Sequence, residues 1–321
     1  MIVYNEGIHL KETDLWFDSK KKVPLSFISN AKFNKFGAHK KIIGTPQTIK
    51  LLGKKVKKSL VLPCPFFRPF SLGKVQVELI PSGYILGSSQ VVVDFDGRRM
   101  LYTGDLKIRP SETTDQAVAR HCDALVMKCH YGLPNYIFPS TQEVMESLKN
   151  FIDNTLTEGN VPVLLVDPLG KAQDLVKSLG DHRYNLRIDD SIYRVIKIYE
   201  EFGVKFSNYE NFNPTQIEGK VLVFPPYSRD SDLLEKIENK RIGVIMGWAL
   251  ESLSVKSVFR ADEAFPLSNH CGYDELIQFV EIVRPEEVYL VGGFSIEFAR
   301  TLQKRGFNAR PLEKPTQMKL L

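Results

Sequence analysis

The chain has 321 residues, enough to bury one large hydrophobic core or two medium ones. Its 43% hydrophobic and 25% charged residues are typical of a folded globular protein and exclude a disordered one. No stretch reaches the ~18 apolar residues of a membrane helix, and no signal segment is evident. Four cysteines are too few for a secreted disulfide framework. The sequence therefore predicts a cytoplasmic protein without a membrane partner.

Positive charge is concentrated in the first 60 residues. This segment holds 13 lysines and 4 acidic residues, a net charge of +9, so the rest of the chain carries −4 (5 − 9). A solvated surface is the ordinary explanation of such lysine runs. One-sided basicity is also the electrostatic footprint of a nucleic-acid-binding protein.

The first ~110 residues are predicted to be rich in β-strands. Residues 74–80 alternate between apolar and polar side chains, which is typical of a half-buried strand. Asp96-Gly97 between the strand-like segments 91–95 and 99–102 predicts a tight β-hairpin.

From about residue 140 the pattern changes to alternating helices and strands. Ser140 and Glu143 form a capping box that predicts a helix start. Buried-strand runs at 161–166, 221–224 and 242–246 alternate with predicted helices, which indicates a parallel α/β unit. The layout predicts a β-rich domain interrupted by an α/β insert.

The residues alone do not identify a catalytic site. The six histidines are scattered and none has the close spacing of a metal-ligand cluster. The chain has no phosphate-binding glycine loop and no nucleophile elbow.

Five motifs nevertheless carry a family resemblance. Their order and spacing resemble those of the β-CASP nucleases, which have the metallo-β-lactamase fold and act on nucleic acids. Within that family the chain is most similar to ligase-associated DNA exonucleases and, more distantly, to mRNA 3′-end processing nucleases. The motifs are Gly83-Tyr-Ile-Leu-Gly-Ser-Ser-Gln-Val91, Leu101-Tyr-Thr-Gly-Asp105, Tyr131-Gly-Leu-Pro-Asn-Tyr136, Leu169-Gly-Lys-Ala-Gln-Asp174 and Pro266-Leu-Ser-Asn-His270.

The resemblance implies an αββα metallo-β-lactamase fold with an inserted β-CASP α/β cap domain. The core is expected from residues 1 to 131 and 266 to 321, and the cap from 132 to 265. It also implies a two-metal site, and most of the positions that form this site in the family hold residues that are unfit as ligands here. These positions are Asn30, Lys32, Asn34, Lys35, Tyr84, Lys128 and Gly292; only Asp105 and His270 remain.

One Asp and one His are too few ligands for a tight metal site, and a protonated lysine cannot coordinate a cation. We therefore expect no cofactor, no metal and no catalysis by the family mechanism. Lysines at the site either compensate Asp105, with Lys32 or Lys35 as its predicted ion-pair partner, or hold a phosphate. A rival metal site would use Cys129-His130 with His270-Cys271, but neighbours on a strand end point in opposite directions.

The sequence thus predicts a nuclease-like pseudoenzyme that binds DNA or RNA, or that assists an active nuclease, ligase or helicase. Two alternatives remain: an active exonuclease with a rebuilt metal site, and a structural partner without affinity for nucleic acid. The predicted nucleic-acid-binding residues are Lys32, Lys35, Lys128, Lys54, Lys55, Lys57 and Lys58.

Overall fold

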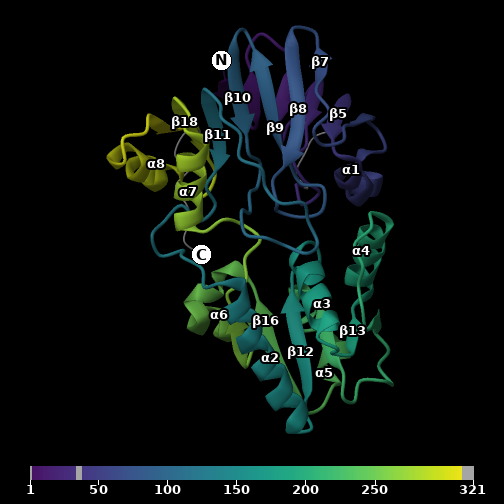
Figure 1. Cartoon of the computed structure of the whole chain (residues 1–321). Coiled ribbons are helices and arrows are strands. Elements are labelled where there is room, and N and C mark those ends of the chain that lie inside the picture. Colours follow the sequence, from purple (N-terminus) through teal and green to yellow (C-terminus); the bar gives the residue numbers. More distant parts are fainter. Residues whose placement is uncertain (1, 34–37, 313–321) are drawn as a thin grey trace. The chain divides into compact units, whose positions relative to one another are not determined.

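The computed structural model describes residues 2–33 and 38–312. The chain divides into two compact units. The core unit comprises Met1–Ile137 and His270–Leu321, and the insert unit comprises Phe138–Asn269. The sequence predicts an insert from 132 to 265. Each unit is described by itself (Figure 1).

The core unit contains two sheets. Sheet A has the order β1 (Ile2–Tyr4), β2 (Ile8–Leu10), β3 (Leu15–Phe17), β4 (Leu25–Phe27), β5 (Lys41–Gly44) and β6 (Leu60–Pro63). Sheet B has the order β19 (Ala309–Pro311), β18 (Glu287–Val291), β11 (Ala124–Lys128), β10 (Arg98–Tyr102), β9 (Ser89–Phe95), β8 (Val75–Pro81) and β7 (Phe70–Leu72). Strands β3 to β6 are parallel neighbours, as are β10, β11, β18 and β19.

A shared apolar core joins the inner faces of the two sheets. Phe17 and Phe27 of sheet A and Tyr102 of sheet B are fully buried there and pack edge to face or tilted. The outer face of sheet B is covered by α7 (Tyr273–Val283) and α8 (Ser295–Lys304), whose apolar faces form a second core with the sheet. Helix α1 (Pro46–Leu52) and the 3-10 turn η1 (Gly53–Val56) lie beside β6 of sheet A. These layers are the αββα arrangement that the resemblance implies.

The hairpin prediction is confirmed. Strands β9 and β10 pair antiparallel, with Phe95 opposite Arg98. Asp96 and Gly97 connect them with φ of 51° and 72°. Positive φ at both central residues is the geometry that favours an Asp-Gly sequence in a two-residue hairpin turn.

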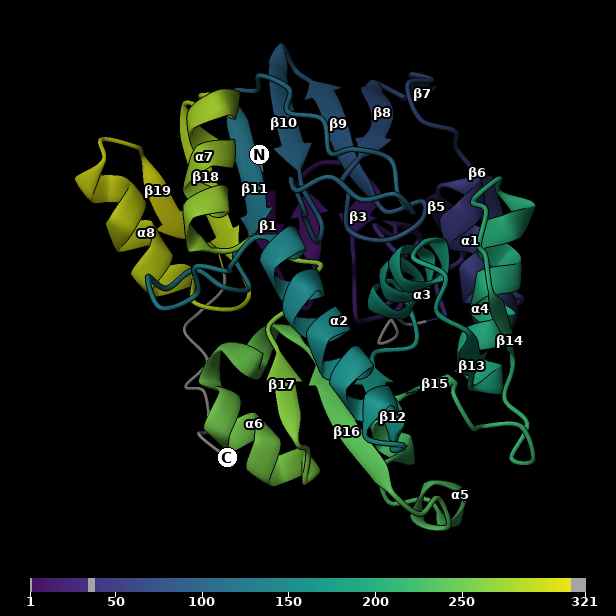
Figure 2. The same cartoon turned by 60° about the horizontal axis from the view of Figure 1, so that its bottom comes forward.

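The insert unit is a parallel sheet between two helical layers. Sheet C has the order β14 (Tyr209–Asn211), β13 (Leu186–Ile188), β15 (Val221–Phe224), β12 (Val161–Val166), β16 (Lys240–Ile245) and β17 (Glu263–Phe265). One face packs on α2 (Thr141–Thr157), α3 (Lys171–Asp181) and α4 (Asp190–Glu201), and Figure 2 shows α2 running along this sheet. The other face packs on α5 (Asp232–Glu235) and α6 (Ser252–Phe259), with η2 (Pro226–Ser228) and η3 (Gly247–Glu251) in the loops.

The helix start predicted at Ser140 is confirmed. The Ser140 side chain accepts a hydrogen bond from Glu143 N, and the Glu143 carboxylate accepts one from Ser140 N. Helix α5, between β15 and β16, is short and ends at Glu235. In the described part of the chain, no helix is both long and apolar enough to cross a membrane.

A close approach at Gly104 joins the two sheets at one end of the sandwich. Gly104 has a φ of +57°, and a Cβ at this position would lie 2.6 Å from Ser29 Cβ. This contact holds the loop after β10 against the loop after β4. Only glycine allows both the backbone conformation and the distance.

Replacing Gly104 with alanine should lower the free energy of unfolding by about 3 kcal/mol, because backbone strain and overpacking add. Gly97→Ala is the matched control: its φ is +72°, but nothing lies within 4 Å of the new Cβ. It should cost about 1 kcal/mol. Urea unfolding of both variants tests this, and equal losses would contradict the close-approach argument.

Candidate functional site

Four strand ends bring the polar residues of the candidate site together. Asp18 follows β3, Asn30 lies after β4, Asp105 lies after β10, and Lys128 is the last residue of β11. Because β3 and β4 are parallel, and β10 and β11 are parallel, their carboxyl ends meet at one end of the sandwich. Here the two sheets leave a cavity of about 210 Å³ lined by Asp18, Asp105 and Lys128.

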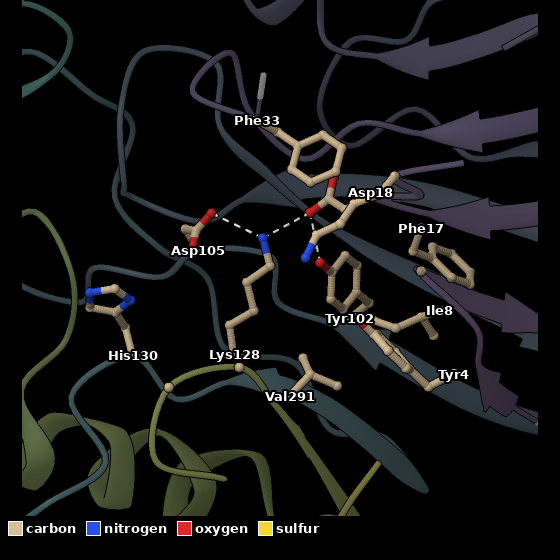
Figure 3. Close-up of a pocket in the computed structure, with 14 residues that line it drawn as sticks. Tyr4, Ile8, Phe17, Asp18, Phe33, Tyr102, Asp105, Lys128, His130 and Val291 are labelled. Carbon is tan, nitrogen blue, oxygen red and sulfur yellow. Dashed lines mark hydrogen bonds and ion pairs between the residues drawn. The ribbon is translucent and has the colours of Figure 1, made fainter. Parts of the chain in front are cut away.

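The Lys128 ammonium lies between two carboxylates. Its Nζ is 3.0 Å from Asp18 Oδ2 and 3.0 Å from Asp105 Oδ2. Figure 3 shows the Lys128 side chain extending from its strand toward both aspartates. The side chain exposes 23% of its surface, so this is a largely buried ion pair and not a surface one.

Asp18 is fixed by the backbone and by donors from both sheets. Its φ of 45° places it in the left-handed region, which aspartate tolerates better than most residues. Oδ1 accepts a hydrogen bond from Ser29 N at 2.8 Å, and Oδ2 accepts one from Ser29 Oγ at 2.7 Å. Tyr102 OH donates to the same Oδ2 at 2.7 Å. The carboxylate is therefore held in place independently of Lys128.

Asp105 has three polar neighbours on different elements. Asn30 Nδ2 donates to its Oδ2 at 2.9 Å, and His270 Nε2 lies 3.5 Å from its Oδ1. Burial alone would raise the pKa of Asp105. The Lys128 charge and the hydrogen bond and charge of His270 outweigh burial and hold this pKa well below its usual value.

The pKa values of Lys128 and Tyr102 are shifted by the same cluster. Burial alone would lower the pKa of Lys128, but Asp105 and then Asp18 raise it well above its usual value. Burial, followed by the negative charge of Asp18, raises the pKa of Tyr102. Lys128 is therefore a protonated cation at neutral pH, and Tyr102 is a neutral hydrogen-bond donor.

Aromatic side chains flank the aspartates. The ring centroids of Tyr84 and His270 are 4.5 Å apart, and His270 stacks on His130 at 4.7 Å with an interplanar angle of 15°. Lys32 Nζ lies 5.5 Å from the centroid of the Tyr84 ring. Tyr84, Lys32 and His270 are thus close together.

The cysteines beside the two histidines face away from the cavity, as the strand-end argument predicts. Cys129 is fully buried in the core under α7 and α8, and its Sγ donates to the carbonyl of Gly292 at 3.3 Å. Cys271 lies in the same core, where burial raises the pKa of its thiol. His130 lines the cavity. The site therefore gains imidazoles and no thiolates.

The other predicted site residues do not all lie at the cavity. Gly292 lines the cavity with a φ of +67°. Asn34 and Lys35 lie outside the described residues. The outer lysines all project into solvent from η1 and the residues that follow it, and none belongs to the cavity lining; they are Lys54, Lys55, Lys57 and Lys58.

Comparison with known proteins found no matching family model. A protein of Opitutus terrae named "Probable DNA ligase" is 31% identical over 322 residues, covering 99% of this chain and 32% of that protein. "Transcription termination factor FttA" of Lokiarchaeum is 31% identical over 192 residues, covering 56% of this chain and 30% of that protein. The chain thus spans about a third of the length of these curated relatives.

Among solved structures, a protein of unknown function from Enterococcus faecalis V583 superposes with a TM-score of 0.59 at 12% identity. The match covers 85% of this chain and 76% of that one, and supports the fold alone. The chain belongs to the metallo-β-lactamase-fold β-CASP family. The resemblance carried by the five sequence motifs is confirmed.

The residues of this β-CASP protein do not fit the metal ions that its family implies. Among the described residues, no group of three or more His, Cys, Asp or Glu side chains is arranged to hold a metal ion. The ammonium of Lys128 stands between the two carboxylates instead, and its charge repels a divalent cation. Asn30 uses its amide to donate to Asp105, the opposite of a ligand's role.

The sequence interpretation predicts that a lysine compensates Asp105, and Lys128 does so, with its Nζ 3.0 Å from Asp105 Oδ2. The predicted pairing with Lys32 or Lys35 stays a prediction, and Lys35 lies outside the described residues. Lys128 is the last residue of β11, which pairs with β10, and Asp105 follows β10. The Lys128 side chain therefore reaches Asp105 directly.

Asp18 is the functional residue that the sequence interpretation missed. Its signal was a carboxylate directly after the short apolar strand Leu15–Phe17. That pattern is common at strand ends, and none of the five motifs quoted above includes the position. Only the pairing of β3 beside β4 places Asp18 within reach of Lys128.

The pH dependence of stability tests this charge arrangement. The lowered pKa of Asp105 contributes stability that is present above its unfolded value and lost as the pH falls through the folded pKa. The raised pKa of Lys128 contributes stability that is present below its unfolded value and lost as the pH rises through the folded pKa. Both contributions are complete between about pH 5 and 9.

Lys128→Met should lower the free energy of unfolding by about 3 kcal/mol at pH 7, because two carboxylates lose their cation. The pKa of Asp105 should then rise, because the Lys128 charge that lowers it is gone, so the deficit should shrink as the pH falls from 7 to 5. Urea unfolding at both values measures the deficit, with the exposed Lys74→Met as control. A deficit that is equal at pH 5 and pH 7 would refute the arrangement.

Proposed function

We propose that this chain is a non-catalytic β-CASP protein that binds nucleic acid and assists an active DNA- or RNA-processing enzyme. The observation that carries the proposal is the position of the Lys128 ammonium between Asp18 and Asp105. Metal-assisted phosphodiester hydrolysis needs a cation that lowers the pKa of a bound water and stabilises the leaving oxygen. An ammonium held by two carboxylates does neither.

The phosphate-binding role is assigned to lysines outside the ion pair. Lys128 has its charge balanced by two aspartates, so it has little remaining attraction for a phosphate. Lys54, Lys55, Lys57 and Lys58 are exposed, and no acidic partner is found for them among the described residues. Four unpaired cations on one short segment favour a phosphate backbone, and Lys32 beside the Tyr84 ring is a secondary contact.

A DNA ligase is the partner that the comparisons favour. The Opitutus relative is named as a probable DNA ligase, and nearly all of this chain matches about a third of it. We infer that this chain acts beside a ligase, and that nucleic-acid ends are the substrate the two would share. A structural subunit without affinity for nucleic acid is the alternative if binding is absent.

Binding should be weak and strongly dependent on salt, because each neutralised phosphate releases counterions. Replacing Lys54, Lys55, Lys57 and Lys58 by Glu should abolish binding of a labelled single-stranded oligonucleotide at low salt. Lys128→Gln is the comparison variant. Under conditions in which this variant is folded, its affinity should differ less than twofold from that of the unchanged chain. Fluorescence anisotropy against salt concentration measures the affinity of both variants. If the variant with all four lysines replaced by Glu binds as tightly as the unchanged chain, these lysines are not the binding surface.

A nuclease assay separates this function from an active enzyme with a rebuilt site. We expect no cleavage of end-labelled single-stranded DNA or RNA with added zinc or manganese, and no stoichiometric metal in the purified protein. Cleavage that disappears in an Asp105→Asn variant would establish the rebuilt-site alternative.

A further inference from the structure

We propose that Asp18 and Asp105 form a cation-binding site that the chain fills with its own Lys128 ammonium, and that a shortened Lys128 opens this site to a small external cation. The inference deepens the proposed function, because it explains how the site persists without metal ions. It does not depend on nucleic-acid binding and is tested without it.

The geometry is that of a bound cation between two anions. One ammonium nitrogen lies at 3.0 Å from an oxygen of each carboxylate, a distance typical of charge-assisted hydrogen bonds. The two carboxylates come from different sheets, after β3 and after β10. Removing the ammonium would leave two negative charges facing each other in a largely buried place, which favours any cation that can enter.

The two carboxylates are held in position by groups other than Lys128. Ser29 N, Ser29 Oγ and Tyr102 OH donate to Asp18, and Asn30 Nδ2 donates to Asp105. Asn30 also donates to Ser29 Oγ at 3.0 Å, which links the two carboxylates through one network. The site should therefore keep its shape when the lysine side chain is shortened.

An external cation has a route to the carboxylates. The cavity of about 210 Å³ is lined by Asp18, Asp105 and Lys128, so the position of the ammonium lies at its wall (Figure 3). The class of ligand is a small cation that donates hydrogen bonds or carries water. A primary alkylammonium copies the lost side chain, and Mg²⁺ binds through one or two carboxylates with water completing its shell.

The decisive experiment is a cation titration of Lys128→Ala followed by thermal unfolding. The variant should have a Tm about 10 °C below that of the unchanged chain. Propylammonium or Mg²⁺ should raise the Tm of the variant by about 4 °C for each tenfold increase in concentration once the site begins to fill. Tetramethylammonium, which has no N–H group, should not raise it at matched ionic strength.

Two controls separate a specific site from a general salt effect. The Tm of the unchanged chain should not respond to propylammonium, Mg²⁺ or a chelator, because Lys128 already fills the site. Lys128→Ala combined with Asp105→Asn should lose the response, because one carboxylate is gone. The proposal is overturned if Lys128→Ala shows no rise beyond the tetramethylammonium control, or if the unchanged chain responds equally.

Chemical labelling of the unchanged chain tests the same site where Lys128→Ala fails to fold. With a limiting amine-acylating reagent, Lys128 should react at least tenfold more slowly than the exposed Lys74, because its ammonium is protonated and enclosed by two carboxylates. Asp105→Asn should bring the rate at Lys128 closer to that at Lys74. Equal rates at Lys128 and Lys74 in the unchanged chain would overturn the proposal, and a failed nuclease or binding assay would not affect it.

Discussion

Two largely buried carboxylates at one end of a β-sandwich require a positive charge, and this requirement determines the arrangement of the site. Asp18 and Asp105 come from different sheets and converge on the Lys128 ammonium at 3.0 Å each. An uncompensated charge in such a place would cost several kcal/mol. The ion pair therefore ties sheet A to sheet B, and its formation requires the two sheets to be packed in the observed register.

The backbone conformations of the loops around the ion pair allow it to form. Asp18 adopts a positive φ so that its carboxylate reaches Ser29 and Tyr102, and Gly104 allows the loop after β10 to approach Ser29. Each of these conformations has a local cost. These conformations permit the hydrogen bonds and the ion pair, whose favourable free energy offsets that cost. The backbone strain and the charge cluster therefore depend on each other.

The lysines of the core unit fall into two groups that differ in burial. Lys128 is neutralised inside the fold, whereas the lysines of η1 and the residues that follow it face solvent. Charge inside the site stabilises the protein, and charge outside it is available to a phosphate backbone.

The sequence by itself determined the elements whose signals are local. The Asp96-Gly97 hairpin, the capping box at Ser140 and the five family motifs depend on residues close in the chain, and all are found. Asp105 and His270, which the sequence names as retained site residues, lie next to each other, with His270 Nε2 3.5 Å from Asp105 Oδ1. The partner of Asp105 and the participation of Asp18 depend on which strand ends meet, which is a property of two sheets packed together. Only the tertiary structure decided them, because Lys128 is 110 positions from Asp18 and 23 from Asp105, and no local pattern encodes either contact.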